Sequence, residues 1–503
     1  MRVLLVSPAP FGGGPERSGG VVGYVGDLAS AMSSAGVSVG VVSGGHVYRP
    51  GFLGRGVGSC GVEELEPFGG VRRFSVVNSP VLAPALWQFG GPESEASCGA
   101  VESAFGDVCG QFEPDVVHVH GFEGLSAGIV SAAKGRGASV VVSVHNYHAF
   151  CPQVYLMQGR REPCIDDRGG LACEGCESAI DMTGERRRRA ADGAGGPTIA
   201  PPPLPPVQTF DDAGEPTDAT LGLWMDGHPM WRANDGVLPL GASGDGGRAG
   251  SAGRYGARRS AFVGALNASD AVLGVSEASA AIAVRMGVDR SIVRVMPIGS
   301  WAAGSASRPL PPGRGEVLRL AFLGFNNYYK GLPMLVDALG LLSPAYRSRI
   351  HLSAYGTGMG SIAGRLRALV GLGGYEIGGA YGRTDVVRLL SGVDAGVVPS
   401  VWHDNGPQTA IEMRALGVPV IGARIGGIPD IVREGVDGLL FRSNDRGDLA
   451  RVIAMCLRKP DLLRAIRGTV GGWHTMSEHA GRLVDVYERA LSSRMVSSGR
   501  EHR

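Results

Sequence analysis

The sequence predicts an α/β protein made of two doubly wound parallel sheets, one toward each end of the chain. Short, nearly uninterrupted apolar runs alternate with stretches whose apolar residues recur at helical spacing. This alternation occurs twice, on either side of a central segment that lacks it. It is typical of parallel sheets covered by helices on both faces. A chain of 503 residues is long enough for two such domains.

The first series begins with a strand, a glycine-rich loop, a helix and a second strand. Residues 3–6 form an apolar run, and the loop 8–20 follows it. From Val21 the apolar residues recur on one helical face, and residues 37–42 form another apolar run. Further strands of this series are predicted at 116–119 and 140–144.

The second series follows a linker rich in proline, glycine, serine and alanine. Its predicted strands are 318–323, 350–354, 395–398 and 418–421, with helices that include 332–339 and 386–390. We therefore expect the chain to divide into a first domain at 1–296, the linker at 297–315, a second domain at 316–480, and a helix with a tail at 481–503.

Between residues 177 and 259 the periodic pattern disappears. A proline run occupies residues 201–206, and a stretch rich in glycine, serine, alanine and arginine occupies 241–256. We interpret 177–259 as a disordered insertion in the first domain. A proline-rich recognition motif is the alternative.

Charge and hydropathy exclude some classes of function. Lys plus Arg is 48 and Asp plus Glu is 47, so the surplus of cations that nucleic-acid binding requires is missing. The sequence has no run of about 18 apolar residues, which a membrane-spanning helix needs. The amino terminus does not resemble an export signal. We expect a cytoplasmic protein, and peripheral contact with the inner face of the membrane remains open.

Four of the eight cysteines are close together in the sequence. They are Cys151, Cys164, Cys173 and Cys176, and the last two have the Cys-x-x-Cys spacing of metal ligands. A structural zinc site at the base of the insertion is one interpretation. Reduced, unliganded thiols are the other.

The segment from Pro399 onward carries the strongest functional signal. A strand ends at Pro399, a loop contains Asp404, and a helix begins near Gln408 with Glu412 on its inner turn. Amides at a helix start suit a diphosphate, and carboxylates can accept hydrogen bonds from sugar or ribose hydroxyls. This pattern favours a nucleotide-sugar site. An ordinary strand-loop-helix with two surface acids would give the same pattern and is the alternative. The other candidate donor-binding residues here are Asn405, Gly406 and Thr409.

This segment resembles the donor-binding segment of the retaining glycosyltransferases of family 4, which have the GT-B fold of two Rossmann-like domains facing a cleft. Glu412 matches the second glutamate of the family signature, which holds the ribose hydroxyls. Asp404 matches the first glutamate, at the donor sugar, and is one methylene shorter.

Other segments carry the same resemblance. Gly324 and Lys330 match a loop whose cations neutralise the donor diphosphate, but Phe325 replaces the family's arginine. Gly356 matches a further donor loop, and Gly19 with Gly20 matches the Gly-Gly loop of the first domain.

The resemblance also implies a cleft histidine near the reacting centre. His145, at the end of the strand 140–144, matches it, with a structural role as the alternative. Of the neighbouring His118 and His120, His120 lies nearer a strand's carboxyl end. The last helix is expected to pack back on the first domain.

We therefore expect a retaining glycosyltransferase that moves a sugar from a nucleoside-diphosphate sugar to a glycan, a lipid-linked or a small-molecule acceptor. The absence of an Asp-x-Asp pair predicts that catalysis needs no metal or other cofactor. A non-catalytic or weakly active nucleotide-sugar-binding protein is the alternative. A nicotinamide-dependent oxidoreductase is disfavoured because the first loop lacks Gly-x-Gly-x-x-Gly.

Overall fold

The computed structural model describes residues 1–10, 20–47, 60–158, 162–165, 170–174, 176, 253–312 and 315–498. These residues form two compact units. The first unit holds the described residues up to 176, those at 253–299 and those from 476 on, and the second unit holds 300–475. Most of the predicted insertion, and Gly19, lie outside the described residues.

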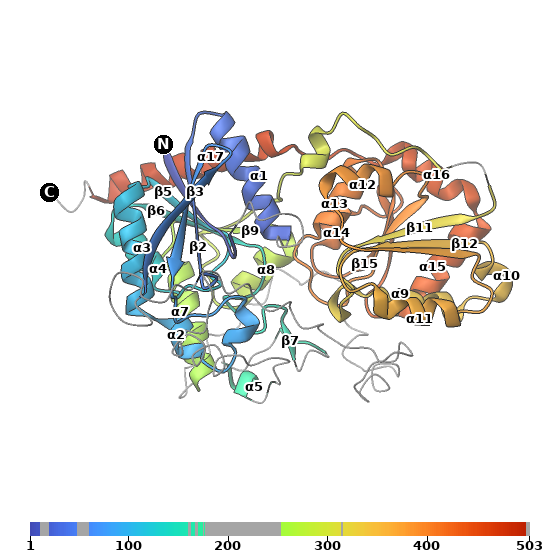
Figure 1. The fold of residues 1–503 in the computed structure, drawn as a ribbon, viewed down its shortest axis with the longest axis horizontal. Coiled ribbons are helices and arrows are strands. Elements are labelled where there is room, and N and C mark those ends of the chain that lie inside the picture. The colour runs from blue at the N-terminus through green and yellow to red at the C-terminus, as the bar shows by residue number, and fades with distance from the viewer. Residues whose placement is uncertain are drawn as a thin grey trace. The chain divides into compact units, whose positions relative to one another are not determined.

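The first unit contains an eight-stranded sheet of order β10-β9-β6-β5-β1-β2-β4-β3 (Figure 1). All neighbours pair in parallel except β3 and β4. The strands are β1 (Arg2–Val6), β2 (Ser38–Gly44), β3 (Gly61–Phe68), β4 (Val71–Val77), β5 (Val116–Val119), β6 (Ser139–Val144), β9 (Ala271–Gly274) and β10 (Val293–Val295).

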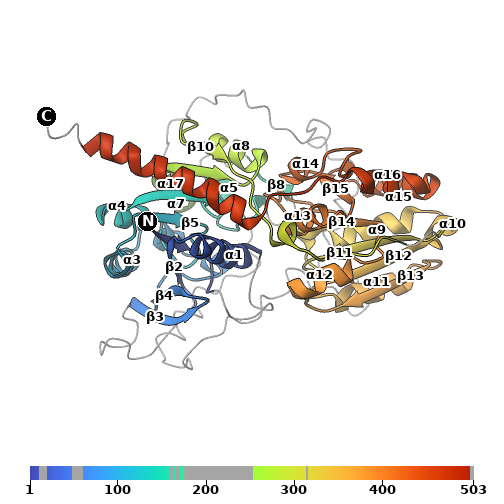
Figure 2. The same cartoon turned by 90° about the horizontal axis from the view of Figure 1, so that it is seen from above.

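Helices cover this sheet, and the last helix of the chain is one of them. They are α1 (Gly20–Ser34), α2 (Pro92–Ala96), α3 (Gly99–Phe112), α4 (Ile129–Gly135), α7 (Arg254–Asn267), α8 (Glu277–Arg285) and α17 (Met476–Ser498), with the 3-10 helix η3 (Ala85–Gln88). Helix α17 packs against α1 and β6, and Figure 2 shows it running along this unit. Among the described helices, none has both the length and the apolar character needed to cross a membrane.

The second unit contains a six-stranded, wholly parallel sheet of order β13-β12-β11-β14-β15-β16. The strands are β11 (Leu318–Leu323), β12 (Ile350–Tyr355), β13 (Gly374–Gly378), β14 (Ala395–Val398), β15 (Val420–Arg424) and β16 (Gly438–Arg442). The helices are α9 (Leu332–Leu341), α10 (Pro344–Arg347), α11 (Gly360–Ala368), α12 (Arg383–Leu389), α13 (Gln408–Ala415), α14 (Ile428–Ile431), α15 (Arg446–Arg458) and α16 (Pro460–Thr469), with the 3-10 helices η7 (Trp301–Gly304) and η8 (Tyr328–Lys330).

The predicted fold class, two doubly wound parallel α/β units, is confirmed. Strands β11 and β14 have the predicted bounds. The strand predicted at 418–421 begins instead at Val420. The N–H of Val418 bonds the carbonyl of Met413 and closes the end of α13, and Pro419 follows without an N–H to donate.

Helix α7 corrects the boundary of the predicted insertion. It begins at Arg254, inside the segment 177–259, and its Arg258 and Arg259 are buried. Arg258 Nε donates to Glu95 Oε2 at 2.5 Å, and Arg258 Nη2 donates to the carbonyl of His148 at 2.7 Å. Ion pairing therefore anchors this turn, and apolar periodicity alone could not reveal it.

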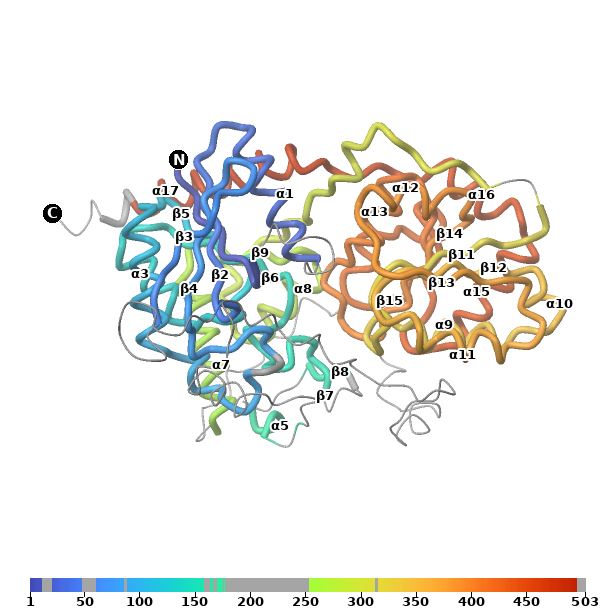
Figure 3. Tube along the Cα trace, viewed as in Figure 1, coloured from blue at the N-terminus to red at the C-terminus, as the bar shows by residue number. Residues whose placement is uncertain are grey.

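Between β6 and α7 the described chain makes a small structure outside the main sheet, with its elements close together in Figure 3. Strands β7 (Met157–Gln158) and β8 (Glu162–Pro163) pair antiparallel, and helix α5 (Leu171–Glu174) packs against α7. The four clustered cysteines lie in or beside these elements. We call the described residues from Cys151 to Cys176 the cysteine segment.

Candidate active site

Lys330 lies in the loop that follows β11, at the end of η8. The side chain of Asn327 accepts a hydrogen bond from the Lys330 backbone N–H at 2.9 Å and fixes this turn. Lys330 Nζ donates to Asp404 Oδ2 at 2.7 Å. The Lys330 side chain is 30% exposed and that of Asp404 only 6%, so the lysine side chain is partly accessible while the carboxylate side chain is buried.

Two glycines let three loops at this edge of the second sheet approach one another. Gly331 has a φ of 73°, and a Cβ on it would lie 1.8 Å from the carbonyl oxygen of Pro399. Gly356 has a φ of 147°, and a Cβ there would lie 1.7 Å from the carbonyl oxygen of Gly324. Only glycine fits either position, so the loops after β11, β12 and β14 converge because of these residues.

The loop between β14 and α13 holds Asp404 on several sides. Ser400 Oγ donates to Asp404 Oδ2 at 3.0 Å. The N–H of Gly427 donates to the carbonyl of Asp404 at 2.7 Å and ties this loop to the turn before α14. Asn405 is buried in the same loop, and Gly406 follows it. The carboxylate of Asp404 is therefore fixed beside Lys330.

Helix α13 begins at Gln408, four residues after Asp404, as the sequence predicts. The residue before it is Pro407, which gives no side-chain cap, and Thr409 is the second residue of the helix. The N–H groups of a first turn carry partial positive charge and bind anions. The start of α13 therefore adds a second positive feature to the sheet edge that carries Lys330.

Glu412 lies one turn into α13 and has an indole as its hydrogen-bond partner. Trp301 Nε1 donates to Glu412 Oε1 at 2.8 Å. The guanidinium of Arg383 lies 6.0 Å from the centre of the Trp301 ring. Burial, and then the negative charge of Glu412, raise the pKa of Tyr381. Trp301 and Tyr381 thus surround Glu412; Trp301 falls in the predicted linker and no sequence motif marked it.

In the first unit, two of the candidate histidines are brought together. His120 follows β5 and His145 follows β6, and His120 Nδ1 lies 3.0 Å from His145 Nε2. His118 instead bonds Tyr487 OH at 2.6 Å and Ser143 Oγ at 2.8 Å. His118 therefore holds β5, β6 and α17 together, whereas His120 and His145 lie at the carboxyl ends of their strands.

Burial keeps these imidazoles neutral. It lowers the pKa of His145 to about 3, although His145 as a whole is only half-buried. Burial first, and the neighbouring histidines second, lower the pKa of His118 and His120 well below the usual value. Neutral imidazoles offer one hydrogen-bond donor and one acceptor each. The pair at the strand ends is thus suited to hydroxyl groups more than to anions.

Helix α17 supplies residues that local sequence patterns could not place. Tyr24 OH lies 2.6 Å from His479 Nε2, and these residues are 455 positions apart. The ring centres of Tyr24 and His145 are 4.8 Å apart. Tyr24 and α17 therefore pack around the histidines, and Gly20 begins the helix that carries Tyr24.

The cysteine segment belongs to the first unit. Burial, and then the nearby Cys151, Cys164 and Cys176, raise the pKa of the Cys173 thiol to about 12. Within the described residues, no three histidine, cysteine or acidic side chains are already arranged to hold a metal ion. The zinc site therefore stays a prediction.

Comparison with known proteins finds a matching glycosyltransferase family model for each unit. Residues 318–459 match the family described as "Glycosyl transferases group 1". Residues 19–179 match the family described as "Glycosyl transferase 4-like domain". Each match covers much of one sheet and its helices.

Curated relatives include two enzymes named D-inositol 3-phosphate glycosyltransferase. That of Actinosynnema mirum is 33% identical over 172 residues, 31% of this chain and 40% of its own length. That of Saccharomonospora viridis is 30% identical over 216 residues, 39% of this chain and 47% of its own length. The chain thus spans under half the length of these relatives.

Solved structures resemble the whole chain at low identity. Sucrose-phosphate synthase from Thermosynechococcus elongatus has a TM-score of 0.59 at 14% identity, covering 98% of this chain and 99% of its own. Anabaena HepE in complex with UDP-glucose has a TM-score of 0.52 at 12% identity. The match covers 99% of this chain and 100% of the HepE chain. These similarities show the fold, and with the two family matches they establish that the chain belongs to the family 4 glycosyltransferases of the GT-B fold.

Proposed function

We propose that the chain is a retaining glycosyltransferase that uses a nucleoside-diphosphate sugar and no catalytic metal. One observation carries the proposal: Lys330 Nζ lies 2.7 Å from Asp404 Oδ2, in loops that leave two adjacent strands of the second sheet. Helix α13 starts four residues beyond Asp404. Parallel α/β sheets bind their ligands at this carboxyl edge.

Different residues at this edge of the sheet bind different parts of the donor. The leaving nucleoside diphosphate gains negative charge as the glycosidic bond breaks, and preorganised positive groups stabilise it. Lys330 and the amides of Gln408 and Thr409 serve this purpose. Glu412 accepts hydrogen bonds from the ribose hydroxyls, and Asp404 lies at the transferred sugar.

In this scheme the donor diphosphate and Asp404 compete for Lys330, because a diphosphate at Lys330 replaces the carboxylate as partner of the ammonium. The loops at Gly324 and Gly356 approach each other closely, and we assign their backbone to donor binding because glycine brings no side chain there. Asn405 and Gly406 complete the donor loop of the second unit, and we assign Gly19 and Gly20 to donor binding from the first unit on the resemblance alone.

We assign the first unit to the acceptor side of the reaction. His145, paired with His120 at 3.0 Å, provides a neutral imidazole for sugar or acceptor hydroxyls. Retention follows if the acceptor attacks the face that the diphosphate leaves, which requires no carboxylate nucleophile. Two relatives carry the name D-inositol 3-phosphate glycosyltransferase, so a phosphorylated polyol is the first small-molecule acceptor to test.

A second candidate function is nucleotide-sugar binding with little or no transfer. Phe325 favours it, because it takes the place of a family arginine and is 46% exposed. Asp404 favours it too, since its carboxylate reaches one methylene less far than glutamate. A displacement near 1 Å can cost about a hundredfold in rate.

Two measurements test these functions in sequence. Thermal shift with UDP, GDP and ADP sugars identifies the donor, since a ligand at 100 times its Kd adds about 2.7 kcal/mol of stability. Release of the nucleoside diphosphate with a panel of polyol phosphates, glycans and lipid-linked acceptors then measures transfer. Stabilisation without release would support the binding protein, and no stabilisation by any nucleotide sugar would contradict both functions.

A further inference from the structure

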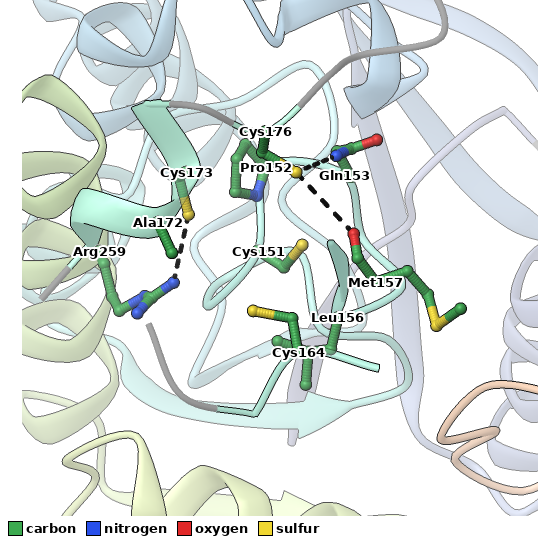
Figure 4. A pocket seen from close by; sticks show the side chains of 10 residues that line it. All are labelled: Cys151, Pro152, Gln153, Leu156, Met157, Cys164, Ala172, Cys173, Cys176 and Arg259. Carbon is green, nitrogen blue, oxygen red and sulfur yellow. Dashed lines mark hydrogen bonds between the residues drawn. The ribbon is translucent and has the colours of Figure 1, made fainter. Parts of the chain in front are cut away.

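The four clustered cysteines converge on one small pocket of the first unit. Figure 4 shows their side chains around this pocket, with the sulfurs of Cys151 and Cys164 directed toward its centre. Cys173 and Cys176 come from helix α5 and the turn after it. All four thiols line the same pocket, with Gln153 and Arg259 beside them.

Two N–H donors point at sulfur in this pocket. Gln153 Nε2 donates to Cys176 Sγ at 2.7 Å. Arg259 Nη2 donates to Cys173 Sγ at 3.7 Å, and Arg259 Nε donates to the carbonyl of Phe150 at 2.8 Å. Donors of this kind stabilise thiolates bound to a metal, whereas neutral thiols or disulfide sulfurs accept only weakly.

The guanidinium of Arg259 also bears on the charge of the pocket. Arg259 is 7% exposed, so its guanidinium lies in a part of the first unit that is shielded from water. Four thiolates around a divalent cation carry a net charge of −2, so they would supply negative charge next to this arginine. Cys151 and Cys173 are each 8% exposed, which shields such a centre from water.

The cysteine segment is built from short pieces. Strands β7 and β8 have two residues each and helix α5 has four. Pieces this short do not fold by themselves, and small structures of this kind are commonly fixed by metals or disulfides. Cys173 packs with Phe89 and Tyr255, and Leu156 and Met157 are buried beside it, so a metal would add to this packing.

From these observations we propose that Cys151, Cys164, Cys173 and Cys176 bind one structural Zn²⁺ ion in a tetrahedral site. Zinc accepts four thiolates at about 2.3 Å, and such sites leave no open position for catalysis. A cysteine side chain turns about a single bond between staggered positions. The proposal requires the four sulfurs to reach the ion through side-chain rotation, because the described thiols are not already at metal-binding positions.

The site lies close in the chain to the candidate acceptor histidine. The N–H groups of Phe150 and Cys151 both bond the carbonyl of Tyr147, at 2.8 and 2.7 Å. A zinc ion on Cys151 therefore fixes the far end of the turn that begins just after His145. Its role is to position this loop, and it stands whether or not the proposed transfer reaction is correct.

Metal analysis of the purified full chain tests the site. After expression with added zinc and gel filtration, we expect ~1 zinc per chain. Cys173→Ala should lose most of it. Cys456→Ala is the matched control, because Cys456 is also buried, in α15 of the second unit, and this variant should retain the zinc of the parent.

Cobalt substitution keeps the test decisive if Cys173→Ala does not fold. Co²⁺ added to the metal-free parent chain should give thiolate-to-cobalt charge transfer and the visible bands of tetrahedral cobalt, and zinc should abolish both. Three results would overturn the proposal: a parent chain without zinc, zinc at the parental level in Cys173→Ala, or disulfides among the four cysteines after alkylation without reductant.

Discussion

Lys330 Nζ and Asp404 Oδ2 are 2.7 Å apart although the residues are 74 positions apart in the sequence. The contact joins the loops after β11 and β14, which are neighbours in the second sheet. Ser400, in the same loop as Asp404, donates to the same carboxylate oxygen at 3.0 Å. The ammonium is thus held at this edge of the sheet before any donor binds, and a donor diphosphate would take the place of the carboxylate as its partner.

We predict that Lys330→Ala lowers kcat more than it weakens donor binding. The ammonium acts on charge that grows as the bond breaks, so its loss affects the transition state most. Loss of one such group costs about 3 kcal/mol, or on the order of a hundredfold in kcat. Steady-state kinetics and donor titration by calorimetry measure the two effects separately.

Two variants control for this result. Lys459→Ala removes an exposed lysine between α15 and α16 and should leave kcat unchanged. Asp404→Glu keeps a carboxylate beside Lys330 and restores the family residue, so it should keep or raise activity. An unchanged kcat in Lys330→Ala would place the leaving diphosphate elsewhere.

We predict that Glu412→Gln mainly weakens nucleotide binding. The substitution keeps one acceptor oxygen but removes the charge that strengthens hydrogen bonds from the ribose hydroxyls. The expected loss is about 1.5–3 kcal/mol of binding free energy, measured by titration with the nucleoside diphosphate alone.

Trp301→Phe serves as the companion variant, since it keeps an aromatic ring and removes only the N–H that bonds Glu412 at 2.8 Å. It should weaken nucleotide binding by less than Glu412→Gln. Equal affinity in the parent chain and Glu412→Gln would show that Glu412 does not contact the ribose.

Much of the fold follows from the sequence because the central strands are buried on both faces. Strand β6, for example, is buried along its whole length and is a nearly continuous apolar run, with four valines and two serines. The edge hairpin β3–β4 carries charged residues such as Glu64 and Arg72, which pair on the surface, so no apolar run marks it. Most of the candidate donor residues lie close together in the sequence, along one strand, loop and helix, so a local pattern reveals them. Trp301 and Tyr487 reach their partners through tertiary contacts alone, which a local pattern cannot encode.

We predict that the first unit loses stability as the pH falls below about 6.5. The buried His118 and His120 have pKa values well below the usual 6.5 in the folded chain, facing His145, His479 and Tyr487. In this range the unfolded chain binds protons that the folded chain does not. Each histidine therefore lowers the free energy of unfolding by about 1.4 kcal/mol for each pH unit below this value. At neutral pH neither state binds the proton, so this loss of stability is absent.

Hydrogen exchange in β5 and β6, followed between pH 7.5 and 5, measures this slope. His118→Gln removes one of the titrating groups and should flatten it. A slope of the opposite sign, with greater protection at pH 5, would mean that the histidines are charged in the folded unit.

We predict that Glu95→Gln destabilises the first unit by about 3–5 kcal/mol, because it leaves the buried Arg258 without its carboxylate. Burial acts to raise the pKa of Glu95, but Arg258 and His148 outweigh it and lower the pKa, so the carboxylate is charged. Denaturant unfolding followed by hydrogen exchange in α7 gives the free energy.

Glu64→Gln is the matched control, because it breaks the Arg72 pair in which both side chains are 42% exposed. Such surface pairs contribute about 0–1 kcal/mol. Similar losses of unfolding free energy in Glu95→Gln and Glu64→Gln would show that water reaches the Glu95–Arg258 pair.

The return of α17 to the first unit reverses the usual order of folding during translation. The ribosome synthesises residues 300–475, the whole of the second unit's described chain, before it makes the helix whose buried Tyr487 bonds His118. At about 5–20 residues per second, the N-terminal unit waits on the order of ten seconds or more for its final piece. The nascent chain can therefore complete its C-terminal unit first, while the face of β5 and β6 that receives α17 stays available to chaperones.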